Sequence, residues 1–191
     1  MTALLAVVLS CLDALDGLGV PYRPVTAQGV DDPVEVTGPV GGITYVPLGH
    51  DRPLVLDCSL VYSLALAGRF LVEEGLRTAY FSDALHRRYV KGTTRWSKHS
   101  YGLAIDVHRF ADGGGRSLSV AGDYELGLGH GRDCLGHPAG ERGRDLRLLW
   151  CRLARSELFR LVLDPDFDED HRDHFHLQVL PWNERDDLAW R

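Results

Sequence analysis

The stretch SKHSYGLAID, residues 97–106, places His99 and Asp106 on either side of Gly102. It leads into LAIDVHRF, residues 103–110, where apolar and polar side chains alternate as in a β-strand with one buried face. Glycine adopts backbone conformations that strain other residues, so Gly102 permits a sharp bend before the strand. Such a bend can bring His99 back toward Asp106.

Successive side chains of a strand point to opposite faces of its sheet. One face of residues 103–110 is therefore apolar, formed by Leu103, Ile105 and Val107. The opposite face consists of Ala104, Asp106 and His108. The sequence thus predicts a carboxylate and an imidazole on the open side of this strand.

A second strand is predicted at residues 174–180, HFHLQVL, within the histidine-rich stretch HRDHFH. Its apolar face is formed by Phe175, Leu177 and Val179. Its other face carries His174, His176 and Gln178. If the two strands are neighbours, one or two of these histidines converge with His99 and Asp106.

Two imidazoles and one carboxylate with an open fourth position form a recurring catalytic zinc shell. Asp173, three residues before His176, is then the candidate general base. Each pattern alone has a simpler explanation. Histidines two apart also occur on solvated strands, Asp106 can form an ion pair with an arginine, and Asp173 can be a turn residue.

The composition is that of an ordinary soluble domain, with 191 residues, 45% hydrophobic and 25% charged. The formal net charge is −6, and no stripe of lysine and arginine appears, so a nucleic-acid partner is not expected. The apolar run 3–9 is too short to span a membrane. We expect a monomer without a membrane span.

The four cysteines, Cys11, Cys58, Cys134 and Cys151, form no CxxC pair, which argues against a thiolate zinc site. Their even number fits two disulfides, for which three pairings are possible. Disulfides are typical of exported proteins, so we expect a periplasmic or extracellular location. No signal peptide is evident in the given sequence. Four buried free thiols in a cytosolic protein are the alternative.

Helical periodicity and capping residues predict helices at residues 3–17 (ending at Gly17 or Gly19), 57–75 (capped by Asp57 or Ser59) and 146–163 (capped by Asp145). Further strands are predicted as short pieces within 20–53, and at 76–82 and 116–122. Glycine-rich residues 111–145 otherwise read as a long loop. The chain is therefore expected to be an α+β protein, with helices packed against a small, mainly antiparallel sheet. We expect residues 1–53 to pack on a main domain formed by 54–191.

The two histidine-bearing stretches resemble a known pattern. SKHSYGLAID is similar to the SxHxxGxAxD signature of zinc D-alanyl-D-alanine carboxypeptidases and dipeptidases, which share their fold with the hedgehog signalling domain. HRDHFH resembles the second signature of that group, in which an acidic residue precedes the last metal ligand by three. The ending HRDHFHLQV, after a cysteine-bearing helix and a DPD turn, most closely resembles the bacterial extensin-like C-terminal domain family.

The resemblance implies a hedgehog/DD-peptidase-like fold and a zinc ion (Zn2+) held by His99, Asp106 and His176. It implies Asp173 as the base, with His171 and His174 as supporting or transition-state groups. The implied activity is a zinc metallopeptidase of the D,D-carboxypeptidase or endopeptidase type, hydrolysing an amide bond in peptidoglycan stem peptides. The alternative is a non-catalytic, zinc-containing module that binds cell wall or protein.

The chain departs from this pattern upstream of the first signature. The peptidases carry a substrate-stabilising arginine there, in a YR-like element, whereas this chain reads AYFSDALHRRY at 79–89. Arg87 or Arg88 is the available substitute, from a different position. The basic run 86–95 can also recognise a substrate carboxylate, because arginine binds carboxylates in a bidentate manner. Trp96, just before the signature, is expected to line a cleft.

Overall fold

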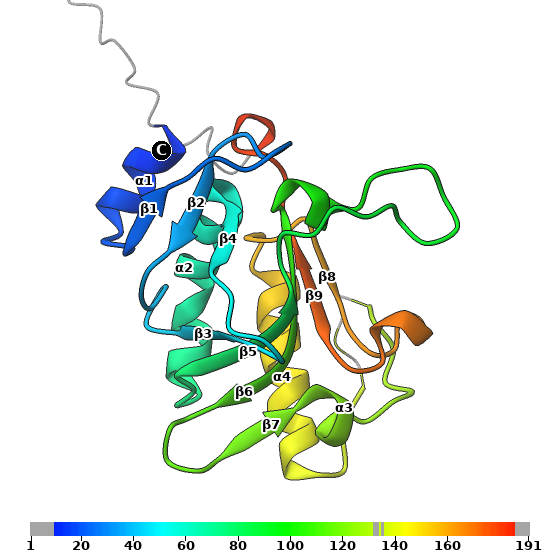
Figure 1. Ribbon diagram of the computed structural model, residues 1–191. Coiled ribbons are helices and arrows are strands. Elements are labelled where there is room, and N and C mark those ends of the chain that lie inside the picture. The colour runs from blue at the N-terminus through cyan, green and yellow to red at the C-terminus, as the bar shows by residue number, and fades with distance from the viewer. Residues whose placement is uncertain (1–9, 132–133, 135, 186–191) are drawn as a thin grey trace, which may run out of the picture.

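The computed structural model describes residues 10–131, 134 and 136–185. Its larger sheet has six strands in the order β3-β5-β6-β9-β8, with β7 paired to β6 (Figure 1). The strands are β3 (Thr44–Pro47), β5 (Thr78–Asp83), β6 (Ala104–Ala111), β7 (Ser117–Ser119), β8 (Leu161–Leu163) and β9 (Phe175–Gln178). Only the β3–β5 pair is parallel, so the expected mainly antiparallel sheet is confirmed.

A smaller antiparallel sheet has the order β1-β2-β4. Its strands are β1 (Tyr22–Pro24), β2 (Pro33–Val36) and β4 (Leu54–Asp57). Strand β3 precedes residue 53 in the chain but lies in the larger sheet. Strand β4 follows residue 53 but lies in the smaller sheet. Buried residues from both sheets belong to one hydrophobic cluster.

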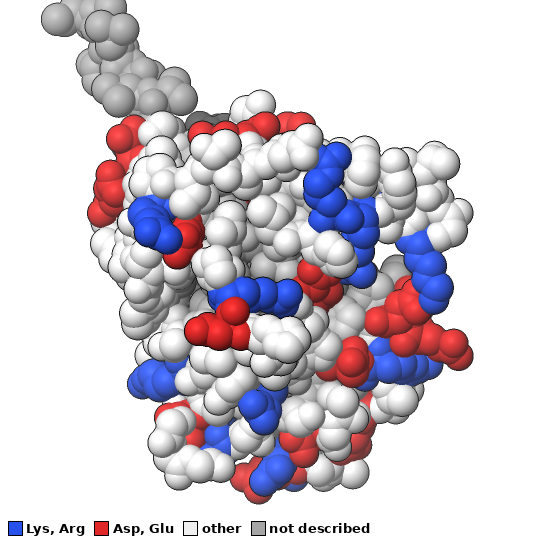
Figure 2. Space-filling view, viewed as in Figure 1, with Lys and Arg blue, Asp and Glu red and all other residues white. Residues whose placement is uncertain are grey.

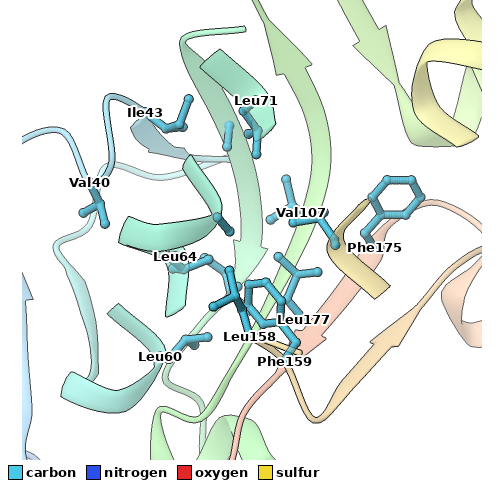
Figure 3. Packing of buried hydrophobic residues seen from close by; sticks show 14 of the residues in the cluster. Val40, Ile43, Leu60, Leu64, Leu71, Val107, Leu158, Phe159, Phe175 and Leu177 are labelled. Atoms are coloured by element: carbon cyan, nitrogen blue, oxygen red, sulfur yellow. The ribbon is translucent and has the colours of Figure 1, made fainter. Parts of the chain in front are cut away.

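Helix α2 (Cys58–Glu73) lies in the middle of that cluster. Asp57 caps it by accepting a hydrogen bond from the Ser59 backbone N–H at 2.9 Å, which satisfies a donor that the first turn leaves free. In Figure 3, Leu60 and Leu64 of α2 lie in the same hydrophobic cluster as Val107 and Leu177 of the larger sheet, with Leu158 and Phe159 between them and Leu177. The helix is apolar on most faces because it packs against several elements rather than one.

Helix α4 (Glu141–Arg155) corrects the prediction of a helix over 146–163. It begins earlier, after Gly140 rather than Asp145, and it ends at Arg155. Glu157 has a positive φ of 61°, which breaks the helical path, and Leu161–Leu163 then form strand β8. The apolar run fits either structure by pattern, and pairing with β9 decides for the strand.

The other predictions need smaller changes. Helix α1 (Cys11–Gly17) has Ser10 as its N-cap, in a capping box with Asp13; the part of the prediction before residue 10 lies outside the described residues. The strand expected at 116–122 is shorter, because Ser119 caps a short helix, α3 (Val120–Asp123). Three 3-10 helices complete the described elements: η1 (Lys98–Tyr101), η2 (Glu169–His171) and η3 (Trp182–Glu184).

All four cysteines are paired, Cys11 with Cys58 and Cys134 with Cys151. The first bond joins α1 to the start of α2, and the second joins the glycine-rich segment to α4. Among the described residues, no helix has both the length and the apolar character to cross a bilayer. Figure 2 shows basic and acidic side chains interspersed over the visible face of the molecule.

Candidate metal centre

The pairing of β6 with β9 places Asp106 directly opposite His176. The next pair along the ladder is Val107 with Phe175, whose side chains point the other way and are buried in the core. The alternation predicted for both strands is therefore confirmed, and so is their proximity. The register puts a carboxylate and an imidazole side by side on one face of the sheet.

His99 reaches this pair from outside the ladder. It lies in η1, whose end is formed by Gly102 with a φ of 66°. The carbonyl of Gly102 accepts a hydrogen bond from the Asp57 N–H at 3.0 Å, and a Cβ on this glycine would lie 2.6 Å from that nitrogen. Glycine thus allows both the left-handed turn and the close backbone contact that direct His99 toward Asp106.

The three side chains converge in a buried group, with 0% exposure at His99, 4% at Asp106 and 9% at His176. His99 Nε2 lies 3.3 Å from both Asp106 Oδ1 and His176 Nδ1. His176 Nδ1 lies 2.8 Å from Asp106 Oδ1. The three atoms could hold one metal ion between them.

The second nitrogen of each ring supports this assignment. His99 Nδ1 donates to the carbonyl oxygen of Ala84 at 3.1 Å, and His176 Nε2 lies 3.5 Å from Gln178 Oε1. Such outer contacts orient a ring and leave its other nitrogen free to bind a metal. Two imidazoles and one carboxylate are the donor set that zinc accepts, so these residues fit a zinc ion.

The charge state of the carboxylate also suits a cation. Burial alone would raise the pKa of Asp106, but hydrogen bonds to His176 and His99 and the charges of His99 and His174 outweigh it. The net effect is a lowered pKa, so Asp106 is ionised at neutral pH. An anionic oxygen is thus held in the middle of the group.

Asp173 lies beside this centre, in the turn between η2 and β9. Its Oδ1 is 2.8 Å from His174 Nδ1, and its side chain is 57% exposed. Burial would raise the pKa of Asp173, but the His174 hydrogen bond and the charges of His108 and His174 lower it. In a regular strand, Asp173 would point to the face opposite His174 and His176. The turn before β9 bends the chain, so the Asp173 carboxylate lies on the same side as these histidines.

The two other predicted histidines lie in contact with the centre. His174 Nε2 is 3.4 Å from Asp106 Oδ1, and burial is the main reason why the pKa of His174 is lowered. The ring of His171 lies 5.7 Å from that of His176, and its Nδ1 pairs with Asp168 Oδ1. The structure therefore brings all six predicted site residues into one region.

A cleft of about 600 Å³ opens beside the centre, and both Trp96 and Arg88 line it. Arg88 Nη2 lies 3.0 Å from Asp83 Oδ2 and 3.5 Å from Asp106 Oδ2, so this guanidinium reaches the buried carboxylate. Arg87 instead lies over the ring of Trp96, 4.8 Å from its centroid. Of the two candidate arginines, Arg88 is the one in contact with the centre.

Several contacts of the site were missed from the sequence. His108 was placed on the open face of its strand without a partner, and the structure brings its Nδ1 to 3.6 Å from Asp173 Oδ2. Lys91 pairs with Asp170 at 2.6 Å, joining two cleft-lining segments that are far apart in the chain. Only the strand alternation at 106–108 hinted at His108. Four other histidines are exposed and lie outside the site: His50, His86, His130 and His137.

The fold and the site define an α+β domain that brings a buried group of side chains able to hold a metal ion to the edge of a cleft. The chain belongs to the family described as "Extensin-like protein C-terminus", which matches residues 11–186. Comparisons with curated proteins and with solved structures find no match. The two disulfides are typical of proteins from an oxidising compartment, such as the periplasm or the extracellular space.

Proposed function

We propose that this chain is a zinc-dependent peptidase-like domain that hydrolyses an amide bond. The observation that carries the proposal is the buried group of His99, Asp106 and His176 at the edge of a cleft. When bound there, zinc polarises a carbonyl and lowers the pKa of a water molecule to about 7. The resemblance of the two signatures to D-alanyl-D-alanine peptidases supports zinc and supports a peptide substrate.

Asp173 acts as the general base in this proposal. Its Oδ1 faces His174 Nδ1, and its Oδ2, which lies 3.6 Å from His108 Nδ1, accepts the proton of the attacking water and returns it to the leaving amine. Its lowered pKa keeps the carboxylate ionised and able to accept a proton. General base catalysis of this kind contributes typically about 10²–10⁴-fold to the rate.

Arg88 stabilises the charge that develops on the carbonyl oxygen, and His174 orients the base Asp173. His174 is largely buried and lies between Asp173 and Asp106, so its position is fixed from two sides. Arg88 lines the cleft, and its backbone N–H donates to Ser100 Oγ at 2.9 Å, which anchors it to the first signature. Fixed donors act on a developing oxyanion without the cost of reorganisation.

Peptidoglycan stem peptides are the proposed substrate class. Their D-amino acid ends present a carboxylate, and the cleft is lined by several basic side chains, Arg88, Lys91, Arg95 and Lys98. Arginine recognises a carboxylate through two parallel hydrogen bonds. A peptide with a free terminal carboxylate therefore suits this cleft better than an amidated one.

The test is hydrolysis of stem peptides by zinc-loaded protein and by Asp173→Asn. We expect this variant to keep its zinc and to lose activity by about 10²–10⁴-fold. Glu169→Gln is the matched control, because Glu169 is an exposed carboxylate of the same segment that belongs to neither group of possible metal ligands. If zinc-loaded parent cleaves no stem peptide but sediments with cell walls, the non-catalytic binding module is the correct function.

A further inference from the structure

A second group of metal-ligating side chains lies one step further along the same ladder. The register Asp106–His176 and Val107–Phe175, continued by one residue, brings His108 opposite His174. The centroids of these two rings are 5.1 Å apart. Asp173, next to His174 in the chain, completes a group of two imidazoles and one carboxylate.

The atoms of this second group face one another. Asp173 Oδ1 lies 2.8 Å from His174 Nδ1, and Asp173 Oδ2 lies 3.6 Å from His108 Nδ1. One ligand atom from each of the three side chains lies within 4.8 Å of the others. In a tetrahedral zinc site, ligand atoms are about 3.3 Å apart, so small adjustments would suffice to enclose an ion.

The remaining nitrogens of the two rings are already in use. His108 Nε2 lies 2.6 Å from Ser82 Oγ, and His174 Nε2 lies 3.4 Å from Asp106 Oδ1. Both contacts orient the rings so that each Nδ1 faces Asp173. This is the arrangement of outer contacts that supports metal-ligating histidines.

We propose that His108, Asp173 and His174 form a second, weaker site for zinc or a similar transition-metal ion. Imidazole nitrogens favour such ions over calcium and magnesium, which take oxygen ligands. The site is weaker than the first because Asp173 is 57% exposed, whereas the side chain of Asp106 is 6% exposed. An exposed carboxylate competes with water and is held less rigidly.

An ion at this second site inhibits hydrolysis, a consequence that rests on the proposed function. It occupies the carboxylate of Asp173 and Nδ1 of His174, so neither the base nor its partner is free. Because the second ion binds the base itself, it is a competitor for Asp173 and not a co-catalyst.

Zinc titration of the full chain tests the second site without reference to activity. We measure bound zinc by equilibrium dialysis over a range of free zinc, for the parent, His108→Ala and His137→Ala. The parent and His137→Ala, which loses an exposed histidine outside both groups, should bind two zinc ions at high free zinc. His108→Ala should bind one. Equal zinc binding by all three proteins at every concentration would overturn the proposal.

A second variant tests the same site in case His108→Ala does not fold. Ser82→Ala removes only the outer contact of the His108 ring, and such a loss typically lowers metal affinity by about 10–100-fold. We expect that decrease for the second zinc alone. An unchanged affinity for both ions in a folded Ser82→Ala protein would argue against His108 as a metal ligand.

The inhibitory role is tested separately, by adding excess zinc to the hydrolysis assay. The parent should lose activity as the second ion binds, whereas His108→Ala should keep its own maximum at the same free zinc. Inhibition that is identical in both proteins would overturn the inhibitory role. If the parent cleaves no stem peptide at all, the proposed function fails, and the zinc count still decides whether the second site exists.

Discussion

Two cross-strand pairs on the same face of one ladder, Asp106–His176 and His108–His174, differ in the third side chain that completes each group. The first is joined by His99, which a glycine turn carries into the protein interior. The second is joined by Asp173, which stands in an open turn. The same residue types on the same face thus become a buried centre or an open one, depending on where the third side chain comes from. Burial, more than ligand identity, separates the two.

The largest expected effect comes from removing a ligand of the buried pair. His176→Ala should lose the tightly bound zinc and, with it, the stabilisation that zinc provides. Binding to the folded state alone contributes about 4.1 kcal/mol when the ligand is at 1,000 times its dissociation constant. The measurement is thermal unfolding with and without a chelator, together with zinc content after dialysis.

The parent should unfold at a lower temperature when chelator is present, and His176→Ala should not respond. His137→Ala, a change at an exposed histidine, should behave like the parent. If chelator still lowers the unfolding temperature of His176→Ala, the Asp106–His176 pair does not hold the tightly bound ion. The contrast between a buried and an open centre would then be wrong.

The next largest effect is expected from a change in the turn that directs His99 toward Asp106 and His176. Gly102→Ala places a side chain at a φ of 66° and against the Asp57 backbone nitrogen. Left-handed backbone costs a non-glycine residue roughly 1–2 kcal/mol, and the contact adds to this. Gly113→Ala is the matched control, since Gly113 has a φ of 79° but no atom within 4 Å of its added Cβ.

Denaturant unfolding should therefore show a larger loss of stability for Gly102→Ala than for Gly113→Ala. Zinc titration should show weaker binding at the first site only, because His99 takes no part in the second group. Equal losses of stability in the two variants would mean that the contact with Asp57 is of no consequence.

A smaller effect is expected from Arg88, which touches the buried pair through Asp106 Oδ2. Arg88→Gln removes this outer contact, and losses of this kind lower metal affinity or activity by about 10–100-fold. Arg87→Gln is the control, because the Arg87 guanidinium lies over Trp96 instead. Competition with a coloured chelator measures the zinc affinity of both. Similar affinities would assign no role at the centre to Arg88.

The smallest effect is expected at Glu125, which lies outside both cross-strand pairs. This carboxylate contributes to the loss of stability at acid pH. The Ala139 and Gly140 N–H groups donate to Glu125 before α4, and these bonds lower its pKa. A carboxyl with a lowered folded-state pKa stabilises the fold above its unfolded value, about 4.3, and this stabilisation is lost as the pH falls further. Glu125→Gln should narrow the stability difference between pH 7 and pH 4, measured in chelator. An unchanged pH profile would contradict the assignment.

The sequence predicted the parts of the site that depend on local pattern. Alternation in residues 103–110 and 174–180 assigned the open and buried faces of both strands, and Gly102 indicated the turn after His99. The predicted helix end at residue 163 was wrong. The apolar run Leu161–Leu163 is compatible with either a helix or a strand, and only its pairing with β9 decides for the strand. Local pattern carries no information on which distant segment will pair.

The same limit applies to the contacts that were missed. His108 and Asp173 are 65 residues apart, and only the register of β6 against β9 brings them together. The choice between Arg87 and Arg88 depended on which side chain the basic segment turns toward Asp106. The disulfide pairing likewise required the packing of α1 on α2 and of the glycine-rich segment on α4.

The register of β6 and β9 has a consequence for how the chain matures. His176 follows Asp106 by 70 residues, so the buried centre cannot form until β9 has been made and has joined the sheet. Ligands that meet only in the folded chain make ion capture a late event in folding. Retained zinc would therefore mark a completely folded domain. A chain that is truncated or incompletely synthesised before β9 would not retain the ion.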